Sequence, residues 1–129
     1  MANAIDVDTM RLRTDQDPQL LGNIIRLFNE EYPPLIVTMK EAIARGDRET
    51  IQKAAHKVKG SLVIFGARAA IDAAEAVESL ALSASMSAAS ESVSVLESKI
   101  EEVVSALSEI AGGELSVHFA HSGSLRNRP

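Results

Sequence analysis

The stretch AAHKVKGSLVIFGA (Ala54–Ala67) belongs to the segment whose helical pattern is clearest in the chain. Apolar residues recur there at intervals of four and three, which places their side chains on one face of an α-helix. That face consists of Ile51, Ala55, Val58, Leu62 and Phe65. Asp47 is suited to cap the start of this helix, and Gly66 to end it in a left-handed conformation. The stretch therefore predicts an amphipathic helix that packs through one face.

The preceding segment, DPQLLGNIIRLFNEEY, is also helical in pattern. Asp17 is a suitable N-cap, and Pro18 would occupy the first helical position. Pro33 and Pro34 follow, and proline inside a helix removes a hydrogen bond and clashes with the preceding turn. The sequence therefore predicts either one long kinked helix or two stacked helices, ending at Gly46.

Two more helices are predicted after Ala67. The first runs from about residue 68 to 82 and has an alanine-rich inner face, which lets neighbouring helices approach closely. This face consists of Ala70, Ala74, Val77 and Ala81. A serine-rich connection is expected over residues 83–90, and the final helix should stop at Gly112 and Gly113. Its inner face consists of Val93, Leu96, Ile100, Val103, Leu107 and Ile110.

Four amphipathic stretches with short connections, and no segment of strand alternation, predict an all-α fold, an antiparallel up-down four-helix bundle. We expect this domain to span residues 17–111. An N-terminal segment, residues 1–16, would precede it, and a flexible tail, residues 112–129, would follow it.

The composition restricts the classes of function. The chain has 129 residues, 46% of them apolar, with a net charge of −5 and no cysteine. Disulfide and thiolate chemistry are excluded, and the net charge disfavours nucleic acid as a partner. The sequence starts without the pattern of a signal peptide, and it has no apolar run of the ~20 residues that span a bilayer. We expect a cytoplasmic protein without membrane contact, and a monomer because no exposed heptad seam requires a dimer.

Positive charge gathers around the central helix. From Arg45 to Arg68 there are six basic residues and two acidic ones. This segment could receive an anionic group or an acidic partner, or it could be an ordinary solvated helix face.

His56 lies about 140° from the centre of the apolar face on a helical wheel, so its side chain should point to solvent. Lys59 follows one turn later, close enough to meet it. The outward side is shared by Glu49, Gln52, Lys53, Gly60 and Val63. An ordinary surface histidine remains one interpretation. Gly60 argues against it, because glycine inside a helix costs ~1 kcal/mol relative to alanine, and here it clears space beside the imidazole.

An exposed imidazole with a nearby cation, cleared space and the apolar side chain of Val63 suits a nucleophile that receives an anion. Phosphoryl transfer needs an in-line nucleophile, which His56 would supply, and cations around the equatorial oxygens, of which Lys59 would supply part. The chain has no GxxxxGK[ST] loop, no glycine-rich nucleotide motif and no clear metal-binding carboxylate cluster. We therefore expect no nucleotide site, cofactor or metal of its own. His118 and His121 in the tail are too few ligands for a metal site.

The same residues resemble the motif of histidine-containing phosphotransfer (HPt) domains, roughly A-H-x-[LIV]-K-G-x-x-x-x-x-G-A. The matching positions are Ala55, His56, Val58, Lys59, Gly60, Gly66 and Ala67. The resemblance covers about residues 17–110 and includes Glu78, where the family often has a glutamate.

The resemblance implies an up-down four-helix bundle that acts as a phosphorelay carrier. His56 would accept a phosphoryl group from the aspartyl phosphate of one receiver domain and pass it to another. Lys59 would stabilise that group, and Gly60 would give access to it. By their position on the helix, Lys53 and Lys57 would add positive field, and Gln52 and Val63 would contact the partner.

The implied partners are response-regulator receiver domains, which would supply Mg²⁺, with a hybrid sensor histidine kinase as a further candidate. Two alternatives stay open: a helical module that binds receiver or kinase domains without transferring phosphate, and a purely structural bundle.

Overall fold

The computed structural model describes residues 4–83 and 85–110. These residues form helices only, so the all-α class predicted from the sequence is confirmed for this part of the chain. The helices are α1 (Val7–Arg13), α2 (Pro18–Arg45), α3 (Arg48–Ile64), α4 (Arg68–Ser83) and α5 (Met86–Glu109). None of them is long and apolar enough to cross a membrane. The tail from Gly112, with its predicted helix stop and its two histidines, lies outside the described residues.

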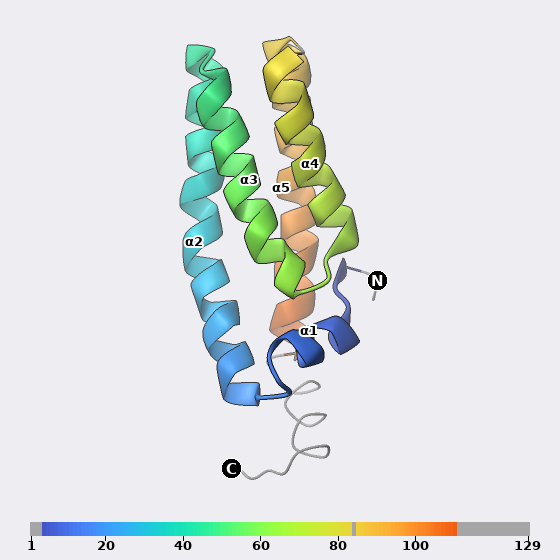
Figure 1. The fold of residues 1–129 in the computed structure, drawn as a ribbon. Coiled ribbons are helices and arrows are strands. Elements are labelled where there is room, and N and C mark those ends of the chain that lie inside the picture. Colours follow the sequence, from blue (N-terminus) through green and yellow to red (C-terminus); the bar gives the residue numbers. More distant parts are fainter. Residues whose placement is uncertain (1–3, 84, 111–129) are drawn as a thin grey trace.

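The four long helices lie alongside one another (Figure 1). α3 packs against α2 and α4, and α5 packs against α4 and α2. Figure 1 shows α2 and α4 running in one direction and α3 and α5 in the other, while the short α1 lies across the end where α3 stops. This arrangement leaves each long helix with one inward face and one face toward solvent.

The interior is formed by the faces that the spacing predicted. Every residue predicted for the inner faces of α3, α4 and α5 is buried. Phe65, at the end of α3, packs edge-on against Phe28 of α2 with ring centroids 5.3 Å apart. Phe28 also stacks on Tyr32. Gly66 has a φ of 59°, the left-handed conformation expected after the last turn of α3.

α2 is one helix from Pro18 to Arg45, so the alternative of two stacked helices is wrong. Pro33 and Pro34 lie inside it and are both exposed. The carbonyls that lose their N–H partners belong to Asn29 and Glu30, which are also exposed, so water can replace the missing donors. Apolar side chains on the opposite face hold both halves of the helix against the core, which outweighs the local cost of the prolines.

The connection between α4 and α5 is shorter than predicted. The serine-rich stretch over residues 83–90 was expected to be a connection, but α5 already begins at Met86. The hydroxyl of Ser85 accepts a hydrogen bond from the backbone N–H of Ala88 and caps the helix. The preference of small residues for turns is weak. Here the cap formed by Ser85 and the burial of Ala89 outweigh it and stabilise the first turn of α5.

The N-terminal segment contains a helix that the sequence pattern did not predict. Asp6 caps α1 by accepting from the N–H of Thr9, and its own N–H donates to the carbonyl of Phe65 at 2.9 Å. Met10 is fully buried, so α1 closes one end of the core. A seven-residue helix with one buried side chain has too few periodic positions to be recognised locally.

Candidate functional site

His56 projects from the middle of α3 into solvent, as the helical wheel predicted. Its side chain is 71% exposed. Nδ1 lies 2.7 Å from Oε2 of Glu78, which α4 contributes from across the helix pair. An ionised carboxylate accepts hydrogen bonds only, so this contact requires the proton on Nδ1. Within the described residues no group bonds to Nε2, so in the neutral form of this ring the nitrogen that carries the free lone pair faces solvent.

Glu78 joins the two residues that sequence analysis singled out. Its second oxygen, Oε1, lies 2.8 Å from Nζ of Lys59. Only 16% of the Glu78 side chain and 23% of the Lys59 side chain are exposed. Glu75, one turn earlier on α4, approaches the same ammonium group at 3.9 Å. Lys59 therefore reaches His56 through a shared carboxylate rather than by direct contact.

The charges of this cluster reinforce one another. Burial raises the pKa of Glu78, but the hydrogen bonds from Lys59 and His56 outweigh burial and leave its pKa below the ordinary value. The hydrogen bond to Glu78 likewise raises the pKa of Lys59. Glu78 is therefore a carboxylate at neutral pH and Lys59 is an ammonium.

Gly60 lies one turn beyond His56 and is exposed. A Cβ atom at this position would have no neighbour within 4 Å, so the interior of the protein does not require glycine here. Gln52 and Val63 are only half-buried, and Val63 packs against the core, so it offers less open apolar surface than the wheel suggested.

The positive charge of this segment is mostly paired. Lys53 forms an ion pair with Glu49 at 3.1 Å, and Arg48 donates to the carbonyl of Ala81. Lys57 is exposed, and no carboxylate of the described residues pairs with it. Of the two lysines that the sequence suggested for added positive field, only Lys57 offers an uncompensated charge.

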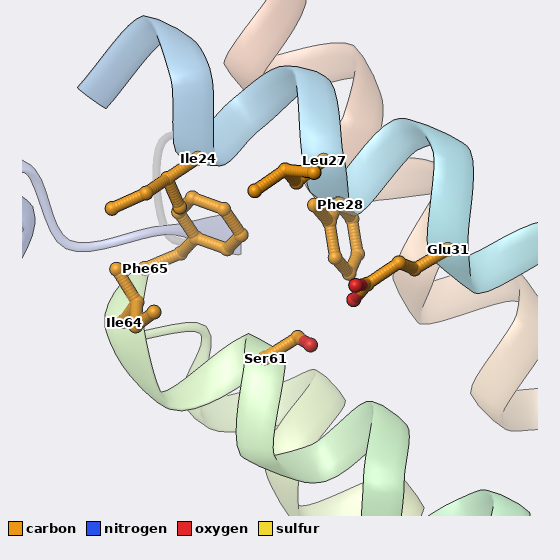
Figure 2. A pocket seen from close by; sticks show the side chains of 7 residues that line it. All are labelled: Ile24, Leu27, Phe28, Glu31, Ser61, Ile64 and Phe65. Carbon is orange, nitrogen blue, oxygen red and sulfur yellow. The ribbon is translucent and has the colours of Figure 1, made fainter. Parts of the chain in front are cut away.

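An apolar groove opens between α2 and α3, the helix that carries His56 (Figure 2). Its lining residues are Ile24, Leu27, Phe28, Glu31, Ser61, Ile64 and Phe65. Leu27 is 50% exposed, and the groove lies on the side of α3 that faces α2, whereas Glu78 approaches His56 from α4. Figure 2 shows Glu31 and Ser61 at one end of the groove and Phe65 at the other.

The described residues hold no group of three or more histidine, cysteine, aspartate or glutamate side chains that could bind a metal ion. The side chains that the structure brings together are an exposed imidazole, two carboxylates and an ammonium group.

The sequence analysis did not identify Glu75, and it did not identify the contacts of Glu78. Glu78 was noted only through the family resemblance, without a partner, and Glu75 was not noted. A glutamate pair at an interval of three on α4, beside the buried Ala74 and Val77, was the available signal.

The model of the Hpt domain family matches residues 23–107, which include all of α3 and α4. The chain therefore belongs to the Hpt domain family. This family implies a phosphotransfer role in phosphorelay signalling, in which Hpt domains interact with receiver domains and kinases. Comparisons with curated proteins and with solved structures found no match.

Proposed function

We propose that this protein is a phosphorelay intermediate that carries a phosphoryl group on Nε2 of His56. The donor is the aspartyl phosphate of one receiver domain, and the acceptor is the aspartate of another. The observation that carries the proposal is the ring geometry: Nδ1 is hydrogen-bonded to Glu78 while Nε2 is open to a partner. The frame we propose is an antiparallel up-down four-helix bundle, supported by the packing of α2–α5 around one core.

The reaction is a direct exchange of bonds to phosphorus. The lone pair of Nε2 attacks the phosphorus atom, a bond forms between nitrogen and phosphorus, and the bond to the aspartyl oxygen breaks. The carboxylate leaves on the receiver domain. Both ring nitrogens are then substituted and the ring carries a positive charge. Glu78 stabilises this charge, because its carboxylate accepts from Nδ1–H at 2.7 Å.

Lys59 supplies the cation for the phosphoryl oxygens. It lies one turn from His56 and is already held near the ring by Glu78. An arriving phosphoryl group competes with the two carboxylates for the ammonium group. Mg²⁺, brought by the receiver domain, would neutralise further charge in the transition state. The second transfer runs the same steps in reverse.

The partner must approach over α3. Gly60 leaves room beside the imidazole, and the groove between α2 and α3 offers apolar surface on the side of α3 that faces α2. We propose that a receiver domain docks there, with Gln52, Lys57 and Val63 at the edges of the contact. A monomer in the cytoplasm suits this role.

The test is a phosphotransfer assay with labelled, phosphorylated receiver domains from the same genome. Wild-type protein should take up acid-labile label, and His56→Gln should take up none. The variant should change the free energy of unfolding by less than about 1 kcal/mol, because the side chain is 71% exposed. Binding of a receiver domain without uptake of label by folded wild-type protein would instead support the non-transferring module.

A further inference from the structure

The cluster around Lys59 carries a surplus of negative charge before any ligand arrives. Two carboxylates, Glu75 and Glu78, face this single ammonium group. No other lysine or arginine of the described residues forms an ion pair with either carboxylate. A phosphoryl group on His56 adds nearly two more negative charges. The phosphorylated protein therefore holds more negative charge in this cluster than the free protein does.

The carboxylates of Glu78 and Glu75 differ in burial and in the hydrogen bonds they accept. Glu78 is half-buried and accepts hydrogen bonds from both His56 and Lys59, so its charge is compensated. Glu75 is 54% exposed, forms no hydrogen bond or ion pair with His56, and lies with Oε2 3.9 Å from Nζ of Lys59. Glu75 is thus the carboxylate whose charge can change without disturbing the ring.

Resting on the proposed function, we infer that Glu75 tunes the phosphoryl-transfer potential of His56 and makes the loaded protein a better donor. Two effects act in the same direction. Its carboxylate repels the phosphoryl group, and it competes with that group for Lys59. Both effects destabilise the phosphorylated form relative to the free form, so the equilibrium shifts toward the acceptor. Glu75 does not touch the reacting atoms and acts through the charge around Lys59.

The experiment uses phosphoramidate as donor, so that no partner protein is needed. Nε2 attacks phosphorus, the nitrogen–phosphorus bond of phosphoramidate breaks, and ammonia leaves. We would measure the ratio of phosphorylated to free protein at a fixed ratio of phosphoramidate to ammonium, approached from both directions. Intact mass and ³¹P NMR would report the ratio, at low salt and at about 1 M salt.

The variants separate charge from structure. Glu75→Gln should raise the ratio about two- to fivefold at low salt, the range typical of exposed charge pairs. At about 1 M salt this increase should largely vanish, because screening removes an electrostatic effect. Glu75→Asp should restore the wild-type ratio. Glu97→Gln is the matched control, since Glu97 pairs with Lys40 at 2.8 Å between α2 and α5, and it should leave the ratio unchanged.

Each outcome decides the inference. An unchanged ratio in Glu75→Gln, an increase that persists at about 1 M salt, or an equal increase in Glu97→Gln would overturn the role of Glu75 while leaving the carrier function intact. Absence of phosphoryl on His56 in the wild-type protein would overturn the proposed function, and this inference with it.

Discussion

Replacing Gly60 by alanine should make the protein more stable and also a poorer phosphoryl carrier. Gly60 lies inside α3, and a Cβ atom there would meet no neighbour within 4 Å. The substitution therefore gains helix propensity, ~1 kcal/mol, without a steric cost. For a domain of this size the melting temperature should rise by roughly 3–6 °C.

The open space that makes the substitution harmless to folding is the space a partner would use. A methyl group there should slow transfer from a receiver domain modestly. Gly60→Leu should slow it by roughly 5- to 150-fold, which corresponds to about 1–3 kcal/mol of overpacking at the contact. Opposite changes in stability and rate would indicate that this glycine serves access to His56 rather than the fold.

Thermal and urea unfolding followed by circular dichroism would measure stability, and initial rates of label uptake would measure transfer. Gly22→Ala is the matched control: Gly22 lies inside α2 with no neighbour within 4 Å of its Cβ position, and it does not line the groove. It should give the same gain in stability with an unchanged rate. A destabilised Gly60→Ala protein, or a Gly60→Leu protein that transfers at the wild-type rate, would refute the reasoning.

Three further perturbations test the fold and the cluster. Gly66→Ala should destabilise the protein by about 2–5 kcal/mol in urea unfolding, because Gly66 has a φ of 59° and its Cβ would lie 2.7 Å from Cβ of Asp6; a loss below about 1 kcal/mol would contradict this. Met10→Ala should cost about 2–5 kcal/mol if α1 belongs to the cooperative unit, and an unchanged urea midpoint would show that it does not. The lowered pKa of Glu78 means that its contribution to stability is present above the ordinary glutamate pKa and is lost as pH falls through the folded-state value. Wild-type protein should therefore lose more stability than Glu78→Gln between pH 7 and acidic pH, and identical pH profiles would argue against this coupling.

A helix could be predicted from the sequence wherever its own pattern of apolar residues is enough to identify it. The inner faces of α3, α4 and α5 could be identified because each contributes a long run of apolar residues at helical spacing. The serine-rich start of α5 was an error, because tertiary packing overrides the local rule there. The prolines inside α2 had left two alternatives open, and packing against the core selects the single helix. α1 was missed because its stability depends on contacts with the end of α3, which a local pattern does not contain.

In the site, too, features that depend on one helix could be predicted from the sequence, and features that depend on the packing of two helices could not. The exposure of His56 followed from the wheel of a single helix. The hydrogen bond to Glu78 joins residues 22 positions apart, on different helices, so it depends on how α3 and α4 pack. The pairing of Lys53 with Glu49, by contrast, has the i,i+4 spacing of a helix and could have been predicted from the sequence.

The cluster around His56 and one wall of the groove belong to different parts of the chain. His56, Lys59 and Glu78 all come from the hairpin of α3 and α4, whereas α2 provides Leu27 and Glu31 to the groove. On the proposed function, mutations on α2 can alter which receiver domain is recognised while the transfer chemistry stays intact. A gene duplicate could thus be rewired to a new signalling partner through a few surface changes, without passing through an inactive intermediate.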